Sequence, residues 1–321
     1  LLTVFSLSGC GAKTAQKTDA ATADGKKLFT IRVATQTQFN ETTIAEDLGY
    51  FKEEGIAIEY TGVLKQGQTE YQTIVQGIND AFIGGHPSNV AQAVLGGVKV
   101  KIVAPGMVDN KDNPHVNYLV RDDSSIKTLN DIVGKKVGIT APGVCTSGYL
   151  DLSLKKNNLP DKVEWVTLPA AGQQEQALKQ GLIDVATSHP PFAGVALKLG
   201  GVHSIGTSWD IVATPGAGLS VRGFSDKFIN EHPDIVKGFA KALYKSHVWI
   251  NSHPTEAKEL IAKRLNLKAE DLTVFYYDTD PTIDPAFIEQ WFKMSEDLGL
   301  WKHGDIQPTD IYTNDYAPKK I

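Results

Sequence analysis

The sequence predicts an α/β fold made of two similar lobes that are joined by two crossing strands. From Leu28 onward, short β-type runs alternate with helical stretches, which is typical of parallel βαβ units with helices on both faces of a sheet. The alternation occurs over residues 29–106 and again over residues 116–208. The chain of 321 residues is long enough for two ordinary domains, each with its own core.

The first series contains four predicted strands and three predicted helices. The strands are expected at 29–35, 56–62, 80–84 and 100–106. The helices are expected at about 42–53, 68–78 and 87–96.

The second series repeats this order. Its strands are expected at 116–122, 135–140, 163–169, 184–188 and 202–208, followed by a strand at 217–223 that leads out. Its helices are expected at 127–134, 146–157, 171–181 and 190–199, and the rest of the chain is expected to be mainly helical at 225–250, 254–265, 269–275 and 284–298. The runs 116–122 and 217–223 each end in an Arg and a turn, so we expect them to be the two crossings. Lobe one is then residues 28–115 plus 224–321, and lobe two is residues 116–223.

The N-terminal residues predict a lipid-anchored protein. An apolar run from Leu1 leads into Leu7-Ser8-Gly9-Cys10, which is how a bacterial lipoprotein begins, with a lipid on the cysteine sulfur. We therefore interpret residues 1–10 as a signal remnant with a lipobox, and the small, polar residues 11–27 as a flexible tether. The alternative is a disordered end of a soluble protein. The first interpretation predicts a protein held outside the cytoplasm and disfavours most intracellular enzymes.

The composition limits the classes of ligand and partner that the protein can bind. The formal net charge is -5 and no long basic run occurs, so nucleic-acid binding is not expected. The sequence holds four arginines, so an anionic ligand cannot be held by a large arginine cluster. The two cysteines are Cys10 and Cys145, which excludes a zinc site built from thiolates alone.

Several stretches carry a family resemblance. Residues 34–60, 77–97, 126–150, 180–197 and 232–257 resemble substrate-binding proteins of ABC importers, in the branch for nitrate, sulfonate, taurine and thiamine precursors. The resemblance implies a periplasmic-binding-protein fold (type II-like), a small-molecule ligand in the cleft between the lobes, and a membrane permease as partner. We also expect a monomer that needs no cofactor.

Loops at the carboxyl ends of strands are the expected binding positions, because ligands bind there in open α/β sheets. After the first strand come Gln36, Gln38 and Asn40, which are neutral hydrogen-bonding residues or simple helix caps. After the third strand come Gly85, His86 and Ser88, where Pro87 suits a first helical turn and the N–H groups of Ser88 and Asn89 are expected to face the cleft.

The second lobe offers the corresponding loops. Cys145, Thr146 and Ser147 lie at an expected helix start, and His189 follows the fourth strand of this series. The matching family loop is rich in serine and threonine, so Cys145 is a departure. At a helix N-terminus its thiol could have a lowered pKa, although packing or ligand contact is favoured over catalysis. Thr214, which precedes the second crossing at 217–223, is also a predicted ligand-binding residue.

These residues favour a solute-binding component of an ABC importer over an enzyme. The expected ligand is a small organic anion such as an aliphatic sulfonate. A thiamine-precursor-like heterocycle is the alternative, and a pyrimidine-precursor enzyme of the wider family is disfavoured because the chain lacks its cysteine cluster. His86, His115 and His189 could together hold a metal, but their long spacing led us to expect none.

Overall fold

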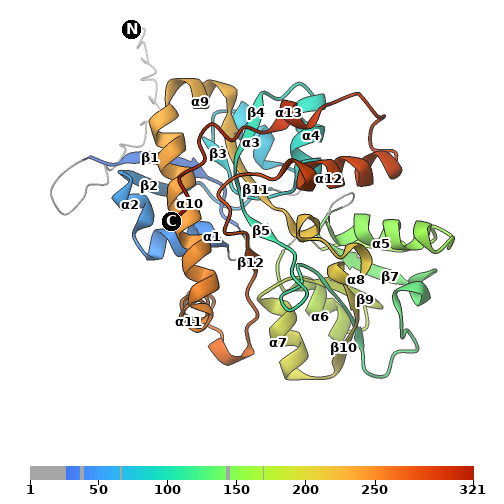
Figure 1. Cartoon of the computed structure of the whole chain (residues 1–321). Helices are drawn as coiled ribbons and strands as arrows, with labels where there is room; N and C mark the ends of the chain where they lie inside the picture. The colour runs from blue at the N-terminus through green and yellow to red at the C-terminus, as the bar shows by residue number, and fades with distance from the viewer. Residues whose placement is uncertain (1–26, 37–39, 66, 142–144, 169) are drawn as a thin grey trace, which may run out of the picture.

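The computed structural model describes residues 27–36, 40–65, 67–141, 145–168 and 170–321. The predicted signal remnant, the lipidation position Cys10 and the tether up to residue 26 lie outside the described residues, as does Gln38. The described chain forms two lobes of mixed helices and strands; the first extends over the top and left of Figure 1, and the second lies at the lower right.

The first lobe is built on two small sheets. One pairs β1 (Phe29–Val33) in parallel with β2 (Ile56–Tyr60). The other has the order β3-β11-β4, in which β11 (Val221–Ser225) lies antiparallel between β3 (Ala81–Phe82) and β4 (Val100–Pro105). The prediction of a strand over all of 217–223 is therefore wrong at its start, because Pro215–Gly218 forms a 3-10 turn first.

Most first-lobe helices follow the predicted positions. They are α1 (Glu41–Asp47), α2 (Tyr50–Glu53), α3 (Glu70–Val75), α4 (Pro87–Leu95), α9 (Asp226–Glu231), α10 (Pro233–Ser252), α11 (Pro254–Leu265), α12 (Pro285–Asp297) and α13 (Pro308–Ile311).

Three helix predictions need correction. The single helix expected over 42–53 breaks at Gly49, which adopts a left-handed φ of 78° that glycine accepts without strain. The helix expected over 225–250 is interrupted before Pro233, which has no N–H to continue α9 and instead starts α10. The helix expected over 269–275 is only a 3-10 turn, Ala269–Asp271, followed by extended chain.

The second lobe contains one five-stranded sheet of order β10-β6-β9-β7-β8. Its strands are β6 (Asn117–Arg121), β7 (Lys136–Ile139), β8 (Glu164–Thr167), β9 (Val185–Ser188) and β10 (Val202–Thr207). Strand β7 pairs in parallel with β8 and β9, as βαβ units require, whereas β6 runs antiparallel to β9 and β10. The sheet is thus mixed, because the crossing strand β6 enters it from the other lobe.

Helices cover this second sheet. They are α5 (Cys145–Lys156), α6 (Gln173–Lys179), α7 (Phe192–Leu199) and the short, unpredicted α8 (Ser208–Val212), while the helix expected at 127–134 is a 3-10 turn, Leu129–Ile132.

The lobes touch on one side through apolar side chains. Helix α12 of the first lobe lies beside α5 of the second (Figure 1), and both contribute to one buried cluster that includes Trp291 and Tyr149. Gly148 lets α12 approach closely, since a Cβ there would lie 3.3 Å from the Met294 side chain. The short sheet of β5 (Met107–Val108) and β12 (Tyr276–Tyr277) lies beside the first crossing. The open side of this junction holds the site described below.

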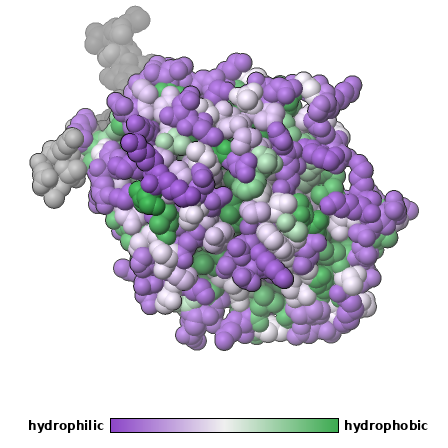
Figure 2. All heavy atoms as spheres, viewed as in Figure 1, coloured by the Kyte–Doolittle hydropathy of each residue, from purple (hydrophilic) through white to green (hydrophobic). Residues whose placement is uncertain are grey.

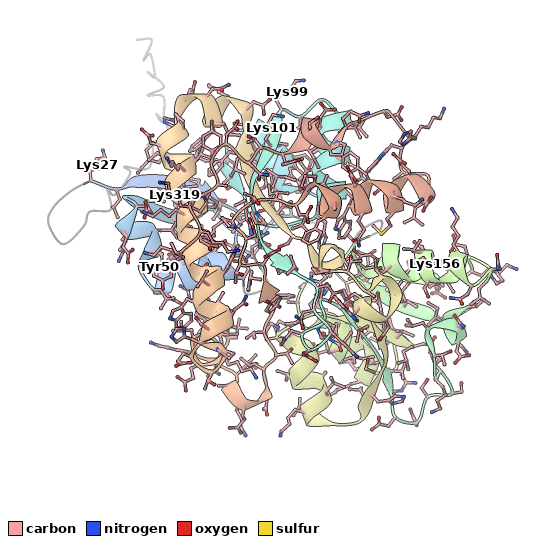
Figure 3. All side chains as sticks on the ribbon, viewed as in Figure 1. Lys27, Tyr50, Lys99, Lys101, Lys156 and Lys319 are labelled. Atoms are coloured by element: carbon pink, nitrogen blue, oxygen red, sulfur yellow. The ribbon has the colours of Figure 1, made fainter. Side chains whose placement is uncertain are left out.

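The surface shown in Figure 2 is mainly hydrophilic, with scattered apolar side chains. In Figure 3, Lys101 lies on β4 in the upper part of the molecule and Lys156 lies on α5 at the right. Neither lysine lines the cleft between the lobes. Across the described ranges, no helix is both long and apolar enough to cross a bilayer.

Candidate functional site

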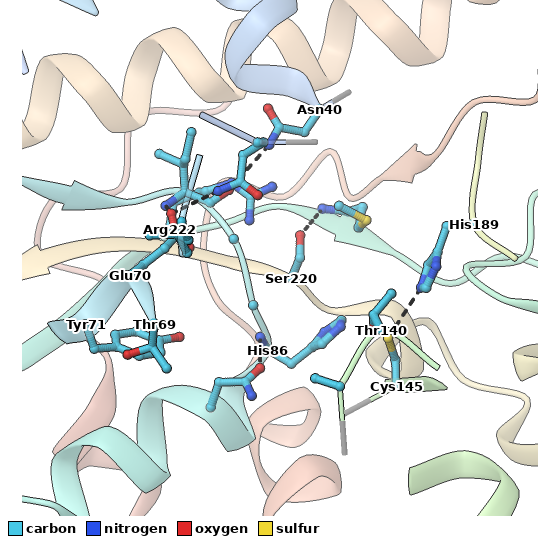
Figure 4. Close-up of a pocket in the computed structure, with 18 of the residues that line it drawn as sticks. Asn40, Thr69, Glu70, Tyr71, His86, Thr140, Cys145, His189, Ser220 and Arg222 are labelled. Carbon is cyan, nitrogen blue, oxygen red and sulfur yellow. Dashed lines mark hydrogen bonds between the residues drawn. The ribbon is translucent and has the colours of Figure 1, made fainter. Parts of the chain in front are cut away.

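A cleft of about 310 Å³ lies between the two lobes, beyond the carboxyl ends of β1, β3, β7 and β9. This volume is at the lower end of the range found for small-molecule sites, ~300–1,000 Å³. The first lobe contributes most of the lining, and the second contributes Thr140, Ala141, Cys145 and His189 (Figure 4). Both lobes therefore reach one ligand-sized space.

An acidic side chain, Glu70, forms one wall. Thr69 caps α3, with Gln72 completing a capping box, so Glu70 is the first residue of the helix and turns inward. Its carboxylate accepts hydrogen bonds from the Ile83 N–H at 3.1 Å and from the Gln36 amide at 3.0 Å. Burial removes water from this carboxylate and raises the pKa of Glu70 to about 6, although these hydrogen bonds oppose the shift.

A basic side chain, Arg222, lines the same cleft but is already paired. Its Nε lies 2.8 Å from Oε1 of Glu41, and its terminal nitrogen donates to Oε2 at 3.0 Å. Both side chains are fully buried, and His247 lies 3.9 Å from Oε1. Burial alone would raise the pKa of Glu41, but Arg222 and His247 outweigh it and lower the value to about 2. Since Glu41 neutralises Arg222, the cleft gains little free positive charge from it.

Uncharged donors line the same cleft. Asn40 caps α1 through its side-chain oxygen and donates to the Ile83 carbonyl at 3.4 Å. The Tyr71 hydroxyl is buried and has no hydrogen-bond partner within the described chain. The Ser220 oxygen accepts from the Met107 N–H at 3.0 Å, which leaves the hydroxyl proton free to donate. The cleft thus presents hydroxyl and amide groups to a ligand.

Three histidines and one cysteine gather where the lobes meet. His115 is edge-on to both His86 and His189, with ring centroids 5.2 Å and 5.0 Å away. The Cys145 sulfur lies 3.4 Å from Nε2 of His189, as the dashed line in Figure 4 marks. All four side chains are buried. The two outer histidines, His86 and His189, come from the loops after β3 and β9, as the sequence predicted for strand ends.

Burial sets the protonation of this cluster. It lowers the pKa of His86 to about 4 and of His189 to about 3, and it raises the pKa of the Cys145 thiol to about 12. The idea of a lowered cysteine pKa at the helix N-terminus is therefore wrong, because desolvation of the thiolate outweighs the helix end. At neutral pH the cluster holds neutral imidazoles and a thiol.

The structure brings together part of the predicted binding set. The predicted residues that line the cleft are Gln36, Asn40, Gly85, His86, Cys145 and His189.

Other predicted residues lie elsewhere. Ser88 is fully buried in α4, and the Asn89 N–H donates to the His86 carbonyl at 3.0 Å rather than facing the cleft. Thr146 contacts the Thr140 hydroxyl at 3.2 Å, and Thr214 bonds to Gln290 on α12. Ser147 is buried in α5 and does not line the cleft.

Sequence reasoning missed Glu70, Tyr71 and Ser220. The Thr69–Gln72 spacing of a capping box could have placed the start of α3 at the cleft, but no local signal shows that Glu70 is buried. Arg222 was noted only as the end of a crossing strand.

Comparison with known proteins gives a consistent assignment. The family model described as NMT1/THI5 like matches residues 36–257. A Bacillus subtilis (strain 168) protein is 26% identical over 285 residues, covering 87% of this chain and 80% of that protein, and its name assigns it provisionally to aliphatic sulfonate binding.

Solved structures share the fold. The periplasmic aliphatic sulphonate binding protein SsuA from Escherichia coli superposes with a TM-score of 0.66 at 17% identity, covering 91% of this chain and 93% of that one. The desulfurization enzyme DSZB superposes with a TM-score of 0.65 at 16% identity, covering 90% and 97%. One two-lobe architecture therefore serves both a binding protein and an enzyme.

Proposed function

The chain belongs to the NMT1/THI5-like family, and from that premise we propose that it is the extracytoplasmic solute-binding component of an ABC importer. Its ligand is a small organic anion such as an aliphatic sulfonate, bound in the cleft between the lobes and passed to a membrane permease. The observation that carries the proposal is the ligand-sized cleft lined from both lobes, which fits capture by closure. The name of the Bacillus subtilis relative supports the ligand class.

The lining explains how such an anion would be held. Sulfonate oxygens accept hydrogen bonds. The hydroxyl protons of Tyr71 and Ser220 are available to donate such bonds without a formal charge. Met107 and Leu64 line the same space and suit an aliphatic tail. The fixed positions of these groups reduce the entropy lost on binding.

Glu70 makes the binding of an anion depend on pH. An ionised carboxylate in the wall repels a sulfonate, and the raised pKa of about 6 brings its protonation close to neutral pH. We therefore expect affinity for a sulfonate to rise as the pH falls through about 6.

Catalysis is the competing function, since an enzyme shares the fold. Cys145 and His189 lie 3.4 Å apart, which is nucleophile–base spacing. However, the pKa of the thiol is raised to about 12 and that of the imidazole is lowered to about 3, so a thiolate–imidazolium pair is disfavoured at neutral pH. We propose binding without turnover.

The remaining proposals concern the membrane anchor of the protein and the bounds of its lobes. We propose lipid attachment at Cys10, a tether over residues 11–27, and a monomer held at the outer face of a membrane. We propose lobes of residues 28–115 plus 224–321 and residues 116–223, and the separate sheet of β6 to β10 supports a division of this kind. Because β11 (Val221–Ser225) pairs with β3 and β4, we propose that the second boundary lies just before Val221.

The test is calorimetry of purified protein with short alkanesulfonates and with a hydroxymethylpyrimidine as the alternative ligand. Ala141→Trp fills the cleft from the second lobe, and the exposed Ala286→Trp on α12 is its matched control. We expect saturable sulfonate binding that Ala141→Trp weakens by ~100-fold or more, about 2.8 kcal/mol, and that the control leaves unchanged.

Three results would count against the proposal. They are pyrimidine binding without sulfonate binding, equal affinity in Ala141→Trp, and conversion of the sulfonate to another product.

A further inference from the structure

The buried cluster of His86, His115, Cys145 and His189 has the composition of a metal site. The nearest ligand atoms of His86, His115 and Cys145 lie within 4.8 Å of one another, and His189 Nε2 is 3.4 Å from the cysteine sulfur. Bond lengths of ~2.0–2.1 Å to nitrogen and ~2.3 Å to sulfur place neighbouring ligands of a tetrahedral zinc ion ~3.5 Å apart. The Cys145–His189 distance already matches that separation.

His115 lacks the partners that a buried imidazole needs. Its side chain is 3% exposed, and neither ring nitrogen has a hydrogen bond within the described chain. Buried polar groups are almost always paired, so an imidazole with two unpaired nitrogens requires an explanation. Its position between His86 and His189 places those nitrogens among the other potential ligands. A metal ion would satisfy one of them.

His86 is held as metal-binding histidines are. Its Nδ1 lies 2.8 Å from the Leu219 carbonyl, so Nδ1 carries the proton and Nε2 is left with a free lone pair. The ring also stacks on Trp291, at 4.4 Å between centroids and 14° between planes, which fixes its orientation. These contacts prepare Nε2 as a ligand before any ion arrives.

We propose that these four side chains bind one zinc-class transition-metal ion between the lobes. Three imidazoles and a thiolate suit Zn²⁺, whereas Mg²⁺ and Ca²⁺ prefer oxygen ligands. On binding, the S–H bond of Cys145 breaks, a metal–sulfur bond forms, and the proton passes to solvent, with no change of oxidation state.

The ion would connect segments that the cleft otherwise separates. His86 starts α4 in the first lobe, His115 lies on the crossing before β6, and Cys145 and His189 belong to the second lobe. Loading the site would therefore hold the lobes together, whether or not a sulfonate is present.

Cobalt binding tests the proposal directly. The purified full chain, stripped with a chelator, is titrated with Co²⁺ and then with competing Zn²⁺. We expect one equivalent of Co²⁺ with the visible bands of tetrahedral coordination and a near-ultraviolet thiolate-to-cobalt band, all displaced by Zn²⁺. Cys145→Ser should abolish the thiolate band, and His115→Ala should weaken binding ~10–100-fold or more. His303→Ala is the matched control, because its side chain is 92% exposed.

The cobalt experiment tests the metal-site proposal even if one of the variants folds poorly. Circular dichroism checks each fold, and Cys145→Ser changes only one atom, so it decides the case if His115→Ala unfolds. Absence of saturable Co²⁺ binding, an octahedral spectrum, or an unchanged thiolate band in Cys145→Ser would overturn the proposal. Sulfonate binding to the metal-free protein is measured in a separate calorimetric experiment. If the protein does not bind a sulfonate, the cobalt titration still shows whether it binds a metal ion.

Discussion

Replacing Glu70 by Gln tests whether the cleft stores an unfavourable buried charge. The folded-state pKa of about 6 lies above the value of 4.5 that is usual for a glutamate, so the folded state holds this proton more tightly than the unfolded chain does. This group therefore favours folding most below about pH 4.5, and its contribution falls as pH rises through about 6. The difference between these two pKa values corresponds to about 2 kcal/mol.

Glu70→Gln removes that titration while keeping the shape and an acceptor for the Ile83 N–H. We expect the stability of the variant relative to wild type to improve by up to about 2 kcal/mol as the pH rises to 7, with most of the change between pH 4.5 and pH 7. Comparing the two proteins at each pH cancels the titration of all other groups. The change of this difference with pH also cancels any constant cost from the altered hydrogen bonds.

The assay is urea unfolding followed by tryptophan fluorescence at several pH values. Glu59→Gln is the matched control, because Glu59 is an exposed carboxylate on β2 of the same lobe. Parallel stability curves for Glu70→Gln and wild type, within ~0.5 kcal/mol over this range, would refute the reasoning about buried charge.

Two further predictions concern the first lobe. Arg222→Met should cost about 3–5 kcal/mol in urea unfolding, because Glu41 is left as an unpaired buried charge, and adding Glu41→Gln should restore part of the loss. A single variant within ~1 kcal/mol of wild type would contradict the pairing. Gly223→Ala should lower the thermal midpoint strongly, because its Cβ would overlap the Lys101 carbonyl on β4, whereas Gly96→Ala, whose Cβ has 3.3 Å to its nearest neighbour, should have little effect. Similar midpoints for the two variants would show that β11 has room to shift.

The sequence predicted features that depend on local rules. The helix expected at 254–265 matches α11, and the one expected at 284–298 matches α12 to within a residue at each end, because prolines mark both starts. Gln36, His86 and His189 reach the cleft because each follows a strand that ends there. Both predictions rest on local signals, namely prolines at helix starts and polar residues that directly follow predicted strands.

The features that the sequence analysis did not predict depend on contacts between residues far apart in the chain. The segment Leu272–Phe275, which the sequence analysis places in a helix, follows the 3-10 turn Ala269–Asp271 without forming a helix. Its Thr, Val and Phe residues favour extended structure, and its apolar side chains pack with α11 in one cluster. Arg222 pairs with Glu41 across 181 positions, and His115 meets His189 from another strand end. No local pattern reports the pairing of Arg222 with Glu41, so the charge of the cleft could not be predicted from residue spacing. The three histidines were recognised as a possible group in the sequence, but only the fold shows that they meet.

The order β3-β11-β4 has a consequence for how the chain is made. The central strand of that sheet is synthesised only after the whole second lobe, so β3 and β4 emerge from the ribosome with a gap between them. The second sheet draws on one continuous stretch and can complete itself earlier. Until residues 221–225 arrive, the older half of the molecule exposes unpaired strand edges, which are prone to aggregation. The three-stranded sheet of the first lobe is therefore completed only after the second lobe has been translated.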